Sequence, residues 1–259
     1  SARQNYEILG GRVKELQRQM AELEQRDNNV YRVIFEADPI PDSARAKAME
    51  KQKEIKLIQG MDENDLAGSI AGNLNYLIKR VAYQEKSYDE IAGFIKNKEV
   101  LLACTPAIQP ISNKDLKRIA SGFGHRIDPV YKTVKMHAGL DFAAPQGTPI
   151  YATANGTVRV AGNTGNGYGN HVIINHGYGY ETLYGHMYKV KTKVRQRVKR
   201  GEVIGYVGST GKSTGPHCHY EVHKNGRPLD PVYFFYNDLT PEQFDRILKM
   251  AAASNQSLD

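Results

Sequence analysis

The chain of 259 residues lacks several features that would assign its class at once. It has only two cysteines, Cys104 and Cys218, and neither belongs to a Cys-x-x-Cys pair, so a disulfide scaffold is excluded. No segment approaches the roughly 18 consecutive apolar residues of a membrane span, and no short apolar stretch with a cleavage site resembles a signal peptide. Because the sequence begins Ser1-Ala2, one expectation is that a targeting segment or membrane anchor has been removed before residue 1.

Histidine is absent from the first 120 residues, and glycine is scarce there. All eight histidines and 18 of the 24 glycines lie beyond that point, so the two halves are predicted to be different kinds of structure. The net charge of +7 is also uneven: residues 1–104 carry 16 Lys+Arg against 17 Asp+Glu, and residues 105–259 carry 19 against 11. This basic excess fits an anionic partner such as a cell-wall polymer, nucleic acid or a membrane surface, and charge alone does not choose among them. Nucleic acid is not expected, because no recognition-helix, zinc-finger or aromatic RNA-binding motif accompanies the charge.

The N-terminal half shows helical periodicity. Apolar residues recur at intervals of three and four, which places each run along one face of a helix. The two runs are Tyr6, Leu9, Val13, Leu16, Met20 and Leu23, and then Ile70, Leu74, Leu77, Val81, Tyr88, Ile91 and Ile95. Residues 38–43 contain two prolines and break the chain, and Asp42 or Ser43 can cap a further helix through Lys56. We favour an antiparallel coiled-coil hairpin over residues 1–104, with a compact helical bundle as the alternative.

The C-terminal half indicates short strands separated by glycine turns. Strands are predicted over residues 149–152, 156–160, 171–174, 203–207 and 219–222. The expected fold class is therefore α+β, a helical hairpin followed by a mostly antiparallel β domain over residues 113–236. Residues 105–112 are predicted to be a linker, and residues 237–259 a C-terminal helix and a disordered tail that begins at Ala251.

Two histidine motifs lie in the β half. His137-x-x-x-Asp141 combines an imidazole with a carboxylate, and His217-Cys218-His219 sets two imidazoles on the same face of a strand with Cys218 on the other. Nitrogen and carboxylate ligands suit Zn²⁺, and three protein ligands with a fourth position for water are typical of a catalytic site. A lone histidine is usually structural, but two clustered pairs in one domain favour a metal centre.

These motifs give the sequence a family resemblance. His137-x-x-x-Asp141, Gly185-His186 and Gly215-Pro216-His217-Cys218-His219 follow one another in the order found in lysostaphin/LytM-type zinc endopeptidases, which the sequence resembles over about residues 112–235. The resemblance implies that His137, Asp141 and His219 bind zinc. It also implies that His217 acts on the metal-bound water and that His186 is the other active-site histidine.

The implied activity is hydrolysis of peptide cross-links in bacterial peptidoglycan, in which a zinc-bound water attacks the scissile carbonyl with acid/base help from histidine. The location is then outside the cytoplasm, in the periplasm or at the cell envelope, with peptidoglycan stem peptides as partners and a protein partner expected through the coiled coil. The alternatives are a non-catalytic activator or scaffold of another wall hydrolase, and a zinc-stabilised binding module. Retention of all five residues favours the enzyme.

Other polar residues have simpler interpretations. The remaining histidines, His125, His171, His176 and His223, are predicted to be structural or exposed, and the Arg126 and Asp128 neighbourhood is explained equally well by a salt bridge or by substrate contact. Tyr131 and Tyr184 are favoured as packing residues. Alternating basic residues at 189, 191, 193, 195, 197 and 199 are favoured as one solvated strand face over a dedicated polyanion site.

Overall fold

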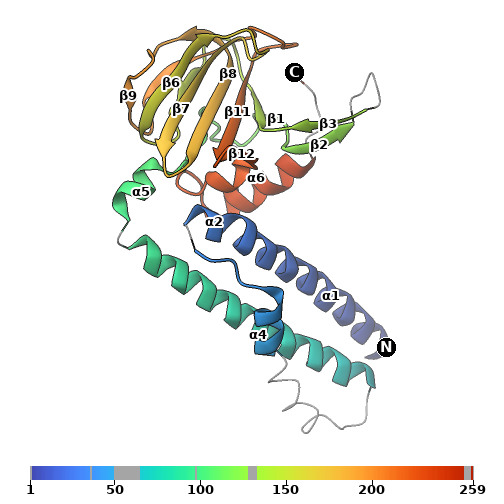
Figure 1. Ribbon diagram of the computed structural model, residues 1–259. Helices are drawn as coiled ribbons and strands as arrows, with labels where there is room; N and C mark the ends of the chain where they lie inside the picture. The colour runs from blue at the N-terminus through green and yellow to red at the C-terminus, as the bar shows by residue number, and fades with distance from the viewer. Residues whose placement is uncertain are drawn as a thin grey trace. The chain divides into compact units, whose positions relative to one another are not determined.

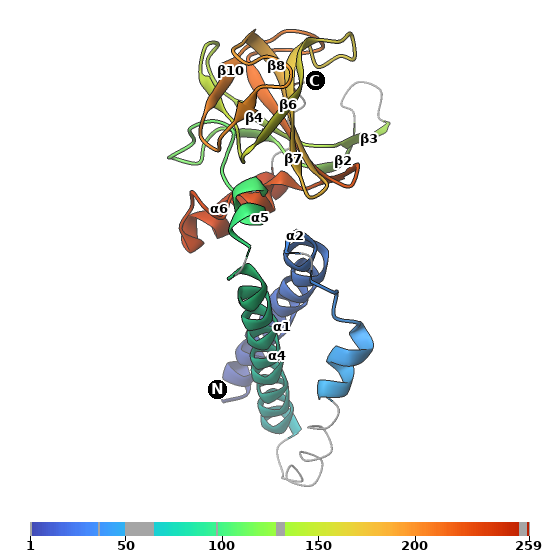
Figure 2. The ribbon, with the colours of Figure 1, turned by 60° about the vertical axis from the view of Figure 1, so that its left-hand side comes forward.

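The computed structural model describes residues 2–35, 37–49, 65–96, 98–127, 133–253 and 258. The chain divides into two units, Ser1–Glu99 and Val100–Asp259. The first is helical and the second is built mainly on antiparallel strands (Figures 1 and 2), which confirms the α+β fold class. In these described parts, none of the helices combines the length and the apolar character that crossing a bilayer requires.

The helical unit is formed by two long helices and a short one between them. Helix α1 (Ala2–Arg26) continues through a π turn, η1 (Asp27–Tyr31), into α2 (Arg32–Ile34), and α4 spans Asp65–Ile95. A further helix covers residues 42–49, and the rest of its predicted range lies outside the described residues. Burial recurs every seven residues, as in helices that pack along one stripe. The buried positions are Val13, Met20, Asp27 and Ile34 on one helix and Ile70, Leu77, Gln84 and Ile91 on the other.

The long helices run parallel, so the predicted antiparallel orientation is wrong. Arg80 donates to Glu24 (Nε to Oε1, 2.7 Å), Tyr88 contacts Tyr31 with ring centroids 6.1 Å apart, and residue numbers rise together along both helices. The reason is that the chain reverses twice. The 42–49 helix returns alongside α1, and Arg45 binds the buried carboxylate of Asp27 (3.0 Å). The apolar spacing predicts helices but carries no information on their direction. Coiled-coil packing remains a prediction.

The β unit is organised around one antiparallel sheet with the strand order β1-β4-β11-β8-β7-β6-β9. Strand β10 pairs with β5 and β8, β12 pairs with β11, and β2 and β3 form a separate ribbon. The strands are β1 (Ile119–Ser121), β2 (Gly124–Ile127), β3 (Val134–His137), β4 (Leu140–Ala143), β5 (Pro149–Tyr151), β6 (Gly156–Asn163), β7 (Asn170–Gly177), β8 (Tyr180–Val190), β9 (Arg197–Val198), β10 (Val203–Val207), β11 (His217–Lys224) and β12 (Arg227–Leu229). The predicted strands are all present.

The core of the β unit lies on the face of β8 and β11 formed by Tyr184 and Tyr220. Their rings stack with centroids 5.3 Å apart, and Phe235 packs on Tyr220 at 6.2 Å. Both hydroxyls are buried and bonded to Thr153, so the aromatic rings carry no unpaired polar atom into the core. Tyr184 is therefore a packing residue, as predicted.

Three helical segments complete this unit: α5 (Glu99–Cys104), the 3₁₀ turn η2 (Pro231–Phe234) and α6 (Pro241–Ala253). Residues 105–112 differ from the predicted linker, because Ala107 and Ile111 are buried and Tyr151 N donates to Pro110 O (2.7 Å). The predicted disordered tail also starts too early, since α6 continues to Ala253 and Ala251 is buried. Residues 254–257 and 259 lie outside the described residues.

The buried imidazole of His176 makes the stability of the fold depend on pH. Its Nδ1 contacts Asn155 O and its Nε2 contacts Thr182 Oγ1, both at 2.7 Å. The pKa of this imidazole is lowered to about 4, because burial disfavours the charged form and Arg200 repels it, although the bond to Asn155 opposes the shift. His171 is also buried, with Nδ1 2.9 Å from Gly169 O. Both residues are structural, as predicted.

We expect the free energy of unfolding to fall by about 3 kcal/mol between pH 6.5 and pH 4 on account of His176 alone. The unfolded chain takes up a proton in this range that the folded chain does not, so the contribution is complete above pH 6.5 and is lost as pH falls through the folded pKa. Denaturant unfolding of the wild type and of His176→Gln, both in chelator, measures it. The exposed His125→Gln is the control. An unchanged pH dependence in His176→Gln would refute the assignment.

Candidate metal centre and active site

Strand pairing brings the separated motifs together. His219 on β11 lies directly opposite Asp141 on β4 and opposite Gly185 on β8, next to His186. The turn from β3 to β4 carries His137 beside them. This turn requires Gly139, because a Cβ there would lie 2.2 Å from Tyr220 O. Residues 137, 141, 186, 217 and 219 are therefore neighbours in space although they span 82 positions of the chain.

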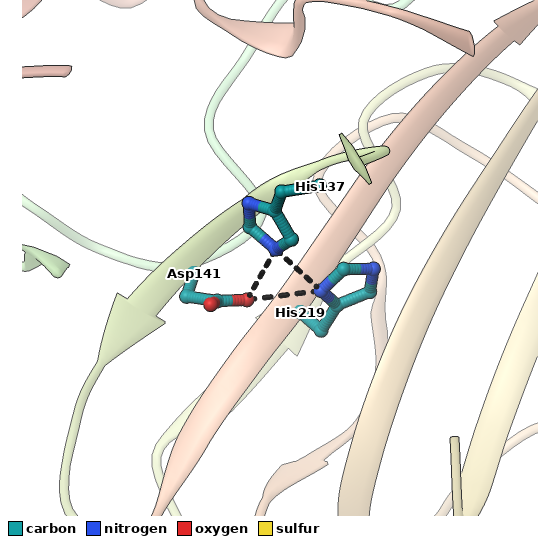
Figure 3. Close-up of side chains that lie close together, drawn as sticks. All are labelled: His137, Asp141 and His219. Carbon is teal, nitrogen blue, oxygen red and sulfur yellow. Dashed lines mark hydrogen bonds and ion pairs between the residues drawn. The ribbon is translucent and has the colours of Figure 1, made fainter. Parts of the chain in front are cut away.

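Three side chains converge on one point (Figure 3). His137 Nε2 lies 3.2 Å from His219 Nδ1 and 3.3 Å from Asp141 Oδ1, and His219 Nδ1 lies 2.9 Å from the same oxygen. All three residues are buried, and together they form a group that could hold a metal ion. Cys218 is buried on the opposite face of β11, and burial raises the pKa of its thiol, as expected for a residue that is not a ligand.

The outward-facing nitrogens of His137 and His219 each make a hydrogen bond that fixes the tautomer of the ring. His137 Nδ1 lies 2.6 Å from Gly122 O, and His219 Nε2 lies 2.7 Å from Glu221 Oε1. A carbonyl or carboxylate oxygen only accepts, so these nitrogens carry the protons and the two inward nitrogens present lone pairs to Asp141. Lone pairs facing a carboxylate repel one another. A cation must therefore sit among them, either an additional proton or a metal ion.

Asp141 supplies the charge at this point. Burial alone would raise the pKa of its carboxyl group, but hydrogen bonds and charge from His137 and His219, when the group carries the additional proton, outweigh burial and lower that pKa to about 2. The carboxyl group is therefore ionised at neutral pH. Within the described part of the chain its Oδ2 atom is buried without a hydrogen-bond partner. A buried carboxylate with an unpaired oxygen is the expected environment of a metal ligand.

His186 and His217 lie beside the three-residue group with ring centroids 4.6 Å apart. His186 Nδ1 is 2.8 Å from Thr210 O, and His217 Nδ1 is 2.8 Å from Gly215 O. Because both carbonyls accept, the Nε2 atom of each neutral imidazole is the lone-pair nitrogen. His217 Nε2 lies 3.8 Å from Asp141 Oδ1, next to the candidate metal position. In this tautomer each Nε2 atom can accept a hydrogen bond.

Glu221 and Tyr168 belong to the site, although the sequence motifs do not single them out. Glu221 is buried; its Oε1 accepts from the Tyr168 hydroxyl (2.7 Å) as well as from His219, and its Oε2 accepts from His223 Nε2 (2.5 Å). Strand alternation could have indicated Glu221, since it lies two residues beyond His219 on the same face of β11. Tyr168 has no comparable signal, because its loop reaches the site only in the folded chain.

A cleft of about 280 Å³ opens over the metal centre. Its buried members include His137, His186, His219 and Glu221, and its more exposed members include Arg126, Lys135, Tyr168 and Lys212. A larger cleft of about 940 Å³ lies by β6 and β9 and contains none of the five motif residues. The volume of a cleft therefore does not indicate which one is the candidate active site. The alternating basic residues at 189–199 are exposed, but they do not form the predicted single strand face, because β8 ends at Val190 and β9 covers only Arg197–Val198. Asp128 and Tyr131 lie outside the described residues.

The fold and the site define an antiparallel β domain with three residues that could hold a metal ion and two flanking histidines. Residues 135–231 match Peptidase family M23, so the chain contains a Peptidase M23 domain and the predicted resemblance is confirmed. DD-carboxypeptidase/endopeptidase Mpg of Neisseria meningitidis is 52% identical over 115 residues, covering 44% of this chain and 26% of that protein. Peptidoglycan DD-endopeptidase ShyA of Vibrio cholerae is 46% identical over 116 residues, covering 44% and 27%.

A solved zinc containing peptidase from Vibrio cholerae is 37% identical, covers 53% of this chain and 40% of that chain, and has a TM-score of 0.43. The lysostaphin catalytic domain from Staphylococcus simulans is 34% identical, covering 48% of this chain and 97% of that chain with a TM-score of 0.41. The chain spans about a quarter of the length of the curated relatives that it matches.

Removing the Glu221 carboxylate tests how His219 is held. We expect Glu221→Gln to weaken binding of a divalent metal ion by about tenfold, because the amide is a poorer acceptor for the Nε2 proton and can turn its NH₂ group toward that nitrogen. Competition with a coloured chelator measures this affinity. Glu181→Gln makes the same charge change in the exposed ion pair with Arg159 and serves as the matched control. Equal affinities for the Glu221 variant and the wild type would exclude the orienting role.

Proposed function

We propose that this chain is a zinc-dependent endopeptidase that hydrolyses peptide cross-links of bacterial peptidoglycan. The supporting observation is the set of three inward-facing ligand atoms, held 2.9–3.3 Å apart, with two more histidines beside them. The named relatives support the substrate class, since ShyA is described as a peptidoglycan DD-endopeptidase. Because peptidoglycan lies outside the cytoplasm, we place the protein in the periplasm or at the cell envelope.

The ligand set fits zinc. Zinc bonds to histidine nitrogen and carboxylate oxygen are about 2.0–2.2 Å long, and a tetrahedral arrangement of such bonds separates the ligand atoms by about 3.3–3.5 Å. The three separations in the structure are at or slightly below this value, so binding requires little movement of His137, Asp141 and His219. These three residues are the proposed ligands. A site with two imidazoles, one carboxylate and an open position is that of a catalytic zinc ion.

His186 and His217 are the proposed acid/base residues. When bound, zinc supplies a Lewis acid that lowers the pKa of a coordinated water toward about 7. Hydrolysis then needs one group to accept a proton and one to donate a proton to the leaving amine. The Nε2 atoms of His186 and His217 provide these two positions, since their Nδ1 protons are engaged by backbone carbonyls.

The proposed bond is a D-alanyl link to a diamino acid, and a glycine bridge is the competing substrate. The helical unit carries no histidine, so we propose that it positions or restrains the enzyme or binds a protein partner. A non-catalytic activator of another hydrolase is the alternative function. Release of cleaved cross-linked muropeptides, detected by mass spectrometry with and without chelator, distinguishes the two.

We expect the purified protein to bind about one zinc ion per chain, as a single three-ligand site requires. The variants His137→Ala and Asp141→Ala should each lose most of this zinc and all cleavage of cross-linked muropeptides. Elemental analysis after dialysis measures the zinc content. His125→Ala, which alters an exposed histidine, is the control. Full zinc occupancy in both ligand variants would show that the metal binds elsewhere.

His186→Ala should separate catalysis from metal binding. Its imidazole lies outside the three-residue ligand group, so we expect the variant to retain zinc while its turnover falls by about 10²-fold or more. Zinc content and the rate of muropeptide cleavage are measured on the same preparation. The assignment fails if the variant loses its zinc, because His186 would then be a ligand.

A further inference from the structure

The cleft over the metal centre has cationic side chains on the β2–β3 ribbon. Lys135 precedes His137 by two residues on β3, so both side chains lie on the same face, about 7 Å apart along the strand. Arg126 pairs directly with Lys135 across the ribbon and therefore shares that face. Both residues line the cleft. The ribbon thus places positive charge beside the proposed ligand His137.

A further cation, Lys212, lines the cleft from the loop that supports His186. Thr210 O binds His186 Nδ1, and two residues later the Lys212 backbone N–H donates to Gly167 O (2.8 Å). Gly211 between them has φ +75°, and a Cβ there would lie 2.3 Å from Gly169 N. Only glycine permits this close approach. The backbone of Lys212 is therefore held in place relative to the proposed acid/base histidine.

Cationic side chains outnumber acidic ones in the lining of the cleft. Glu221 is the acidic side chain among the described lining residues, and both of its oxygens are already engaged, by His219 and Tyr168 on one and His223 on the other. With zinc bound, the charge at the cleft becomes still more positive. A substrate that carries negative charge near its scissile bond complements this lining, whereas a neutral peptide does not.

On the basis of the proposed function, we infer that Lys135 with Arg126 and Lys212 bind free carboxylates on residues that flank the scissile bond. The cross-link of matching chemistry joins a D-alanyl carbonyl to the side-chain amine of a diamino acid that keeps a carboxylate on the carbon bearing that amine. A chain of unsubstituted glycines has no such group. These cations are therefore specificity residues that distinguish acidic cross-links from neutral ones.

The test crosses enzyme variants with substrate variants. The substrates are a D-alanyl-diaminopimelate cross-linked fragment with free carboxylates and the same fragment as carboxamides. Each of Lys135→Gln and Lys212→Gln should raise KM for the carboxylate fragment roughly fivefold, with kcat and zinc content unchanged. For the carboxamide, the wild type should already show the raised KM, and the variants should add nothing to it. Lys189→Gln removes an equivalent exposed charge outside the cleft and should leave both KM values unchanged.

Two outcomes would overturn the inference. In the first, the wild type and both cleft variants discriminate equally between carboxylate and carboxamide. In the second, Lys189→Gln has the same effect as the cleft variants, so that only overall charge matters. Calorimetric binding of both fragments to zinc-loaded His186→Ala tests the same discrimination without turnover. A third result separates the inference from the proposed activity. If the wild type cleaves neither fragment but the binding assay still favours the carboxylate over the carboxamide, the proposed activity is wrong and the carboxylate recognition is supported.

Discussion

The site depends on one electrostatic conflict, the buried carboxylate of Asp141 facing two imidazole nitrogens whose lone pairs point at it. Hydrogen bonds that His137 donates to Gly122 O and His219 donates to Glu221 hold both rings in this orientation, so the conflict cannot be relieved by turning either ring. Only a cation resolves it. The β4–β11 pairing that sets Asp141 opposite His219 therefore also brings together two of the three residues that could hold a metal ion.

Hydrogen bonds also set the tautomers of the flanking histidines. The Nδ1–H groups of His186 and His217 each donate a hydrogen bond to a backbone carbonyl, so the lone pair of each neutral ring is at Nε2. The backbone cannot change its hydrogen-bonding capacity, so the tautomers of these residues follow from the course of the chain. The histidines proposed as proton acceptors and those proposed as metal ligands therefore differ only in where the inward nitrogen lies. This division of roles rests on placement, since the residue type is the same.

In the helical unit the main constraint is a buried charge. Its buried stripe is interrupted by Asp27, which Arg45 (3.0 Å) and Ser87 bind, and a buried charge of this kind requires close partners. Arg32 also reaches this cluster and donates to Ser87. The partners come from three helical segments, so Asp27 Oδ2 has all of them only when the 42–49 helix returns alongside the long helices. The parallel arrangement of α1 and α4 is the consequence of that return.

Residue spacing in the sequence predicted the long helices, five of the twelve strands in the described residues, and the two histidine motifs. Apolar residues at intervals of three and four specify helices, alternation specifies strands, and His217-x-His219 specifies two imidazoles on one face, because these periods are properties of the local backbone. Helix direction, the packed course of residues 105–112 and the parts played by Glu221 and Tyr168 required the tertiary structure. Each depends on contacts between segments far apart in the chain, and local spacing contains no information on which distant partner a side chain meets.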